Sequence, residues 1–276
     1  MTSTAAAGQE MADELILVTE VPLGDATVAL LTLNRPDSRN PIDKVTIRLL
    51  KTILSELIDE GQVAAVILTG TGDAFSAGGD LKGYRALYRN PASFKTFMKD
   101  FDEVCRILET APFLTIAMIN GTCVAGGLEL SLACDFITIA DEARVGDGHL
   151  RFAQLPGAGG SQRLVRAIGV QRAKYWLYTA RLFPAAEAVA AGLAVFSAPV
   201  TELLERTLAL AAEVTELTPL GWRTMKHLVD TAQQTHLPDG LRIESRTVFE
   251  YATSSHDATE GLKAFAERRP ARYLGR

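Results

Sequence analysis

Three short apolar runs constrain the fold of this 276-residue chain more than any other feature. They are AAVILTG at 64–70, LTIAMI at 114–119 and FITIA at 136–140. Apolar runs of this length without polar alternation are typical of strands that are buried on both faces. Because helical segments separate these runs, we predict an α/β fold with right-handed βαβ crossovers and a mostly parallel sheet.

Two segments before the first run extend this prediction. Residues 15–33 contain two β-rich runs, LILVTEV and TVALLTL, and the turn residues at 22–25 between them indicate a hairpin. Asp43 is expected to cap a helix that ends near residue 58, and Gly61 follows as a stop signal. The apolar residues of that helix recur at helical spacing, at Val45, Leu49, Ile53 and Leu57.

From about residue 201 the chain changes character, because strand signals give way to helical ones. Four successive helices are predicted, at 201–216, 221–234, 241–253 and 258–268. Their apolar residues, such as Val248, Phe249, Leu262 and Phe265, exceed what isolated helices can bury, so we expect packing on the core or on a neighbouring subunit. We therefore predict a flexible N-terminal tail at 1–12, a core at 13–200 and a helical oligomerisation region at 201–276.

Composition and charge exclude several classes of protein. The net charge of −5 argues against a nucleic-acid binder, and the helix predicted at 43–58 mixes acidic and basic residues too closely to bind RNA. No apolar run approaches the roughly 20 residues of a membrane span, and the first dozen residues lack the pattern of a secretory signal. The three cysteines show no CxxC pairing, which favours reduced thiols. We expect a cytoplasmic protein with no nucleic-acid or membrane partner.

Three glycine-rich loops collect the residues best suited to chemistry. The first, FSAGGDLK at 75–82, has small residues that let a ligand approach backbone N–H groups. In the second, NGTCVAGGLELSLACD at 120–135, two glycines open a predicted helix whose N-terminus can stabilise an oxyanion. The third, at 145–169, contains a rigid PGAGG loop that leads into a helix beginning near Ser161.

Glu129 lies in the first turn of the helix predicted in the second loop. Its neighbours are apolar, namely Leu128, Leu130, Leu132 and Ala133. A carboxylate is costly to bury among such residues unless it is paired or functional. Glu129 therefore has either a structural partner or a catalytic role, and the residues alone leave both open.

Six motifs occur in a characteristic order and spacing. They are VALLTLNRPDSRNPI, FSAGGDLK, NGTCVAGGLELSLACD, LPGAGGSQRLVRAIG, ARLFPAAEAVAAGLA and EGLKAFAERRPARY. From residue 15 to 273 the chain thereby resembles the crotonase (enoyl-CoA hydratase/isomerase) superfamily. The resemblance implies a crotonase-type spiral of ββα units with a C-terminal helical trimerisation region, assembled as a homotrimer or a dimer of trimers. It also implies an acyl-CoA substrate, with coenzyme A as part of the thioester, and neither a metal nor a permanently bound cofactor.

The resemblance also implies roles for single residues. The backbone N–H groups of Gly79 and Gly126 would form an oxyanion hole for the thioester carbonyl, and Glu129 would be the catalytic carboxylate. Ala77 lies where the family's backbone meets the adenine amino group, and Gly157 where it helps to hold the reacting water. Further expected contacts to coenzyme A or substrate are Asp80, Leu81, Lys82 and Arg35.

One position departs from the pattern of the family's hydratases, in which two glutamates act on a single water. The second glutamate belongs to a stretch resembling FGQPE, and the matching residues here are VGDGH, which places His149 at its position. A histidine can act as acid or base near neutral pH, so a Glu129–His149 pair can support hydration. A cationic imidazole could instead suit a substrate with a second carboxylate, or His149 could merely pack beside the pocket.

The expected reaction is hydration of a 2-enoyl-CoA, because Glu129 and the third loop are in place. Isomerisation would need Glu129 alone, and the same scaffold supports CoA-thioester hydrolases, decarboxylases and C–C lyases. A non-enzymatic acyl-CoA-binding protein is a further alternative, motivated by the missing second glutamate. Side chains at 84–88 and 94–101, together with Phe249, are expected to line the acyl pocket.

Overall fold

The computed structural model describes residues 15–276, which form two compact units. One unit reaches to Leu208 and the other is Ala209–Arg276, and α9 (Val200–Thr215) runs across the point of division. The tail predicted at 1–12 lies outside the described residues. Within 15–276 no helix is long and apolar enough to cross a membrane.

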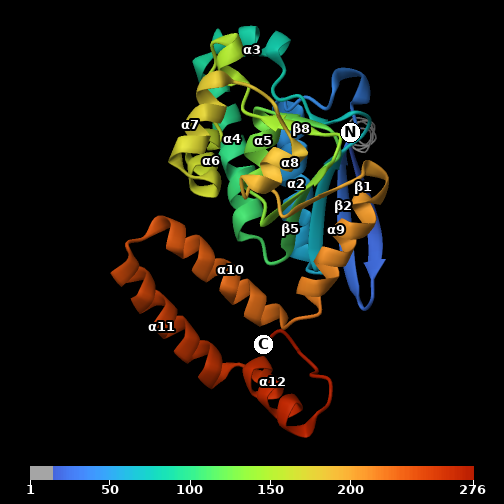
Figure 1. Ribbon diagram of the computed structural model, residues 1–276, viewed down its shortest axis with the longest axis vertical. Helices are drawn as coiled ribbons and strands as arrows, with labels where there is room; N and C mark the ends of the chain where they lie inside the picture. The colour runs from blue at the N-terminus through green and yellow to red at the C-terminus, as the bar shows by residue number, and fades with distance from the viewer. Residues whose placement is uncertain (1–14) are drawn as a thin grey trace, which may run out of the picture. The chain divides into compact units, whose positions relative to one another are not determined.

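The first unit is built on a six-stranded sheet (Figure 1). In spatial order its strands are β1 (Ile16–Leu23), β2 (Ala26–Leu33), β3 (Ala65–Gly70), β5 (Leu114–Ile119), β7 (Phe136–Ala140) and β10 (Phe196–Ala198). β1 and β2 form an antiparallel hairpin, and the pairs that follow are parallel. All residues of β3 and β5 are buried. The predicted hairpin and mostly parallel sheet are confirmed.

The hairpin turn is tighter than predicted. Pro22 pairs with Thr27 inside the ladder, so the connection shrinks to Gly24 and Asp25. β1 is the edge strand of the sheet, where a proline can turn its missing N–H site away from the ladder. The prediction of Pro22 as a turn residue was therefore wrong, because it took no account of the edge position.

A second, smaller sheet was not predicted. Its strands, in spatial order, are β4 (Ala74–Ser76), β6 (Thr122–Val124), β8 (Arg144–Gly146) and β9 (Phe183–Pro184). β4 follows β3, β6 follows β5 and β8 follows β7 after short turns, so each of these three main strands is followed in sequence by a short strand of the second sheet. β4 pairs parallel with β6, and β6 pairs parallel with β8. This arrangement is the repeated ββα unit that the resemblance implied.

Helices connect and flank these strands. They are η1 (Pro36–Ser38), α2 (Lys44–Glu60), α3 (Leu81–Tyr88), α4 (Pro91–Thr110), α5 (Gly126–Ser131), η2 (His149–Phe152), α6 (Gly160–Ile168), α7 (Val170–Thr179) and α8 (Ala185–Ala190). α2 packs against α4, and α6 packs against α7. The helix predicted after the third loop is α6, one residue earlier than expected.

The ends of α2 agree with the sequence, and its most buried face lies beside the apolar row noted there. Asp43 accepts hydrogen bonds from the Val45 and Thr46 N–H groups, and Gly61 closes the helix in a left-handed conformation. The fully buried apolar residues are Ile47, Leu50 and Leu54, whereas Val45 is 54% exposed. Residues four apart drift by about 40° around a helix at each step. The row at 45, 49, 53 and 57 therefore does not stay on the buried face, and its members Leu49, Ile53 and Leu57 are half-buried.

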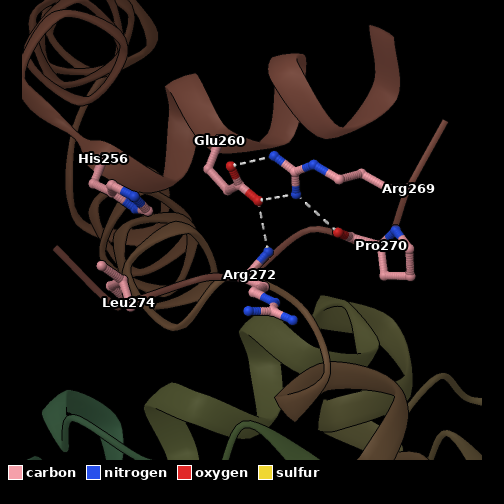
Figure 2. A pocket seen from close by; sticks show the side chains of 6 residues that line it. All are labelled: His256, Glu260, Arg269, Pro270, Arg272 and Leu274. Atoms are coloured by element: carbon pink, nitrogen blue, oxygen red, sulfur yellow. Dashed lines mark hydrogen bonds and ion pairs between the residues drawn. The ribbon is translucent and has the colours of Figure 1, made fainter. Parts of the chain in front are cut away.

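The second unit consists of helices, as predicted (Figure 1). After the end of α9 these are α10 (Pro219–Gln234), α11 (Leu237–Ser254) and α12 (His256–Glu267). The chain beyond α12 folds back onto it, and Figure 2 shows Glu260 holding Arg269 and the backbone N–H of Arg272. The resulting hollow is lined by His256, Glu260, Arg269, Pro270, Arg272 and Leu274.

Asp257 is a buried carboxylate of the second unit, and its replacement tests what stabilises this unit. Its carboxylate accepts hydrogen bonds from the Thr218 hydroxyl (2.7 Å), the Leu274 N–H (2.7 Å) and the Gly275 N–H (3.0 Å). Replacing it with alanine leaves these partly buried donors without that acceptor, so we expect Asp257→Ala to lower the free energy of unfolding by about 1–3 kcal/mol. Urea unfolding at neutral pH measures this loss.

The same carboxylate also predicts a dependence on pH. Burial raises the pKa of Asp257, but the hydrogen bonds from Leu274, Thr218, His256 and Gly275 outweigh burial and lower it. A carboxyl with a lowered pKa in the folded state stabilises the protein above its ordinary pKa, and that contribution is lost as the pH falls. In Asp257→Ala the free energy of unfolding should therefore fall less steeply with decreasing pH than in the wild type. Asp239→Ala, which removes an exposed carboxylate of α11, should keep the pH dependence of the wild type. Equal acid sensitivity of Asp257→Ala and the wild type would contradict the prediction.

Candidate active site

The three glycine-rich loops converge because of the second sheet. β4, β6 and β8 are parallel neighbours, so their C-terminal ends lie at the same edge. Residues 77–80 follow β4, residues 125–129 follow β6 and residues 147–149 follow β8. The residues brought to this edge are Gly79, Gly126, Glu129 and His149.

The first and second loops touch through Gly78 and Ala125. Gly78 has φ +92°, and a Cβ atom there would lie 2.9 Å from the Ala125 Cβ and 3.0 Å from the Val124 carbonyl oxygen. Only glycine fits this contact without moving one of the loops. The contact comes one residue before Gly79 in one loop and one residue before Gly126 in the other, so it sets the spacing of these two residues.

The backbone N–H groups of Gly79 and Gly126 are both available to a ligand. Gly126 is the first residue of α5, whose first helical hydrogen bond runs from the Glu129 N–H to the Ala125 carbonyl (2.9 Å). Among residues 15–276, no acceptor engages the Gly79 N–H. The Ile42 N–H holds the first loop by donating to the Gly78 carbonyl at 2.8 Å. Two such donors can bind an oxyanion.

Glu129 is 2% exposed and is held by the third loop. Its Oε1 accepts hydrogen bonds from the Ala158 N–H (2.6 Å) and the Gly160 N–H (2.9 Å). Its Oε2 lies 3.9 Å from the Nε2 of His149. Burial raises the pKa of Glu129, and the Gly160 and Ala158 N–H groups with the nearby His149 offset this only in part. The carboxyl thus has structural partners at one oxygen and faces the site with the other.

His149 forms a pair with Asp147, which is 1% exposed. The His149 Nδ1 lies 2.9 Å from the Asp147 Oδ1, and the His149 backbone N–H donates to the Asp147 Oδ2 at 3.3 Å. Burial lowers the pKa of His149, but the hydrogen bond and negative charge of Asp147, together with Glu129, outweigh burial and raise it. Sequence reasoning missed this pairing, which the two-residue spacing in DGH could have indicated.

Arg163 was also missed, although it fastens the third loop. Its Nη1 donates to the Ala158 carbonyl at 2.7 Å, and its Nε pairs with Glu109 of α4 at 2.5 Å. These two contacts of Arg163 fix the backbone at Ala158, whose N–H binds the Glu129 carboxylate. The position of Arg163 in the first turn of the helix after the PGAGG loop is the signal that could have indicated it.

The residues expected around coenzyme A lie at the start of α3. Ala77 is exposed, and its N–H donates to the Arg39 carbonyl at 2.8 Å. Asp80 caps α3 by accepting a hydrogen bond from the Lys82 N–H at 3.1 Å. The side chains of Leu81 and Lys82 are exposed. Four of the expected contact residues therefore lie together beside Gly79.

Arg35 and Gly157 lie in different surroundings. The Arg35 guanidinium donates to Asp43 (2.7 Å), the Pro41 carbonyl (2.5 Å) and Thr46 (2.8 Å), which ties it to the start of α2. Gly157 lies in the third loop against Met98 of α4.

A row of aromatic rings borders both glycines of the candidate oxyanion hole. Tyr84 of α3 lies against Gly79, and Phe101 of α4 lies against Gly126. Tyr84 contacts Phe97 at a centroid distance of 6.1 Å, and Phe97 contacts Phe101 at 6.0 Å. The segments predicted to line an acyl pocket, 84–88 and 94–101, therefore lie next to the site, while Phe249 belongs to the second unit. In the described part of the chain, no group of three His, Cys, Asp or Glu residues could hold a metal ion.

Comparisons with known proteins identify the family of this chain. The enoyl-CoA hydratase/isomerase family model matches residues 24–276. A Mycobacterium tuberculosis protein named "Probable enoyl-CoA hydratase" is 35% identical over 252 residues, which cover 91% of this chain and 96% of that protein. The crystal structure of the enoyl-CoA hydratase from Bacillus anthracis matches with a TM-score of 0.86 and 35% identity, over 94% of this chain and 99% of that one. The chain therefore belongs to the enoyl-CoA hydratase/isomerase family and has its crotonase fold.

Proposed function

We propose that this protein is an enoyl-CoA hydratase, which adds water to the double bond of a 2-enoyl-CoA. One observation carries the proposal. Two proton-transfer groups, Glu129 and His149, face each other at 3.9 Å, at the same sheet edge as the N–H groups of Gly79 and Gly126. Hydration needs one group that takes a proton from water and one that gives a proton to carbon.

The proposed reaction proceeds through an enolate. The N–H groups of Gly79 and Gly126 bind the thioester carbonyl oxygen, which becomes the oxyanion. Glu129 takes a proton from water while the water oxygen bonds to the β-carbon. The His149 imidazolium then gives its Nε2 proton to the α-carbon. Glu129 is now protonated and His149 neutral, and return of the proton from Oε2 to Nε2 restores the starting state.

Substrate binding is part of the same proposal. Ala77, Asp80, Leu81 and Lys82 are proposed to contact the coenzyme A part of the thioester, because they are adjacent to Gly79 in the chain. Gly157 is proposed to help hold the water, beside the Ala158 N–H that binds Glu129. Arg35 remains a weaker candidate, since its guanidinium already has three acceptors. Coenzyme A enters as part of the substrate, and no permanently bound cofactor is proposed.

We also propose a homotrimer or a hexamer formed by two trimers, in the cytoplasm. The support is a set of large apolar side chains on the helices of the second unit that are exposed in the single chain. They include Phe249 (68%), Leu262 (75%) and Phe265 (86%). Such side chains are typical of surfaces that a partner covers. Light scattering of the purified protein measures the mass of the assembly.

A specific observation keeps isomerisation as the second candidate. Glu129 has one oxygen bound by two N–H groups and the other directed into the site, so a single carboxylate could move a proton between two carbons. That reaction would not need His149. The hydratase proposal is favoured because His149 is directed toward Glu129 and not toward solvent.

A panel of acyl-CoA thioesters tests the proposal. The protein is incubated with enoyl-, hydroxy-, dicarboxyl- and aryl-CoA esters, and the masses of the products are measured by mass spectrometry. Gain of one water by an enoyl ester supports hydration, and a moved double bond at unchanged mass supports isomerisation. In the hydratase case His149→Ala should lose about 10²-fold in rate or more. A panel in which every thioester stays unchanged would refute both reactions.

A further inference from the structure

We propose that Asp147 is a positioning residue, which holds His149 with its Nδ1 bound and its protonated Nε2 directed at the reaction, so that this chain uses an imidazolium where two-glutamate hydratases use a carboxyl. This inference rests on the proposed hydration, and it assigns a role to a residue that does not itself touch the substrate.

The contacts of Asp147 are directed almost wholly at His149. One carboxylate oxygen lies 2.9 Å from the imidazole Nδ1, and the other accepts the His149 backbone N–H at 3.3 Å. A carboxylate can only accept, so Nδ1 must carry a hydrogen. The ring is therefore oriented with Nε2 toward the Glu129 Oε2, at 3.9 Å. An aspartate that orients a histidine in this way also stabilises its cationic form.

The backbone between the two residues supports the pairing. Gly148 has φ +68°, and a Cβ atom there would lie 2.5 Å from the Val124 Cγ1. This left-handed residue reverses the chain direction locally and lets Asp147 and His149 face each other across it. Both side chains of the pair are largely shielded, with 2% of Asp147 and 12% of His149 exposed.

The charges around His149 are favourable to its cationic form. Asp147 approaches it from the end of β8, and Glu129 approaches it from α5. Tyr84 of α3 and Cys105 of α4 interact electrostatically with the Glu129 carboxylate, and burial raises the pKa of both, to about 12 for Cys105, so both stay neutral. The imidazolium thus has a carboxylate on each side.

The Asp147–His149 pair predicts how the rate of hydration depends on pH on the alkaline side. The proton donor is active only while His149 is protonated, and the negative charge of Asp147 raises the pKa of His149 above its ordinary value. Hydration should therefore fall as the pH rises through that raised pKa. Without the charge of Asp147 the fall should begin at lower pH.

The test compares Asp147→Asn with the wild type in the hydration of crotonyl-CoA across the pH range. We expect kcat at pH 8 to fall by about 10²-fold or more, with KM changed by less than about threefold and the alkaline limb shifted down by about one unit. Asp147→Glu keeps the charge and should recover part of the rate. Asp141→Asn, an exposed aspartate before β8, should behave as the wild type. A profile of Asp147→Asn that superimposes on the wild type would overturn the proposal.

A second measurement separates this proposal from the proposed function. Nuclear magnetic resonance of ¹⁵N-histidine-labelled protein follows the His149 imidazole directly, with His149→Gln to assign its signal. We expect His149 to titrate above its ordinary pKa in the wild type and at lower pH in Asp147→Asn. The same midpoint in both proteins would overturn the role of Asp147 and leave hydration standing. Shifted midpoints in a protein that hydrates no thioester would support the pair and refute hydration.

Discussion

Glu129→Gln is expected to lower kcat for hydration by about 10²–10⁴-fold, with little change in KM. The glutamine side chain keeps the size of glutamate, and its amide oxygen can still accept the Ala158 and Gly160 N–H groups. The amide cannot take a proton from water, so the variant loses the base and keeps the binding geometry. Steady-state kinetics with crotonyl-CoA measure both constants.

The matched control is Glu103→Gln on α4. Glu103 pairs with Arg106 one turn away, at 2.7 Å, on the exposed surface, so the same chemical change there should leave kcat unchanged. If Glu129→Gln keeps more than a tenth of the wild-type kcat, Glu129 is not the base and the reaction must use another group.

The same variant should not lose stability. Burial raises the pKa of Glu129 in the folded protein. A group whose pKa is raised by folding binds its proton more tightly in the folded state, so its ionisation at neutral pH costs stability. Glu129→Gln removes that cost, and its melting temperature at pH 7 should equal or exceed that of the wild type. A lowered melting temperature would mean that the two hydrogen bonds of the carboxylate outweigh its burial.

Much of the main sheet could be predicted from the sequence, because its strands carry a local signal. The runs at 64–70, 114–119 and 136–140 are apolar on both faces, and the structure places β3, β5 and β7 there. The helices of the second unit were predicted for the same reason, since each repeats its apolar residues over several turns. A long buried strand or helix leaves an apolar pattern in the sequence that can be recognised without knowing the rest of the fold.

The strands that build the site carry no such signal. β4, β6 and β8 have three residues each, which is too short for either alternation or a continuous apolar run to be recognised. Their parallel pairing is nevertheless what brings the first, second and third loops to one edge. Without the family resemblance, the sequence would indicate three glycine-rich loops and not that they meet.

The ionisable side chains of the site were easier to predict than the backbone N–H groups that bind them. Glu129 is conspicuous because an ionisable residue in an apolar motif needs an explanation, and His149 because it departs from the pattern of the family's hydratases. The N–H groups of Ala158 and Gly160 leave no mark in the sequence, because any residue can supply a backbone donor. The contact between Arg35 and coenzyme A stays a prediction, and the pairing of Arg35 with Asp43 is a further feature that the sequence did not indicate.

Gly78→Ala is expected to lower kcat by about 10²-fold through the geometry of the oxyanion hole. The new methyl group would lie 2.9 Å from the Ala125 Cβ and 3.0 Å from the Val124 carbonyl oxygen. None of these atoms can rotate away, so the first and second loops must move apart by a few tenths of an ångström. The donors of an oxyanion hole act over a narrow range of about 2.7–3.1 Å, so the Gly79 and Gly126 N–H groups could no longer bind one oxygen equally well.

Gly24→Ala separates this effect from backbone strain. Gly24 lies in the turn between β1 and β2 with φ +60°, and a Cβ atom there would meet no atom within 4 Å. Both substitutions place an alanine at positive φ, which costs about 1–2 kcal/mol, so both should lower the melting temperature. Only Gly78→Ala should lower kcat. Equal kcat values in the two variants would show that the contact between the loops does not set the spacing of the donors, and the oxyanion hole would then have to be held by other contacts, such as the Ile42 N–H on the Gly78 carbonyl.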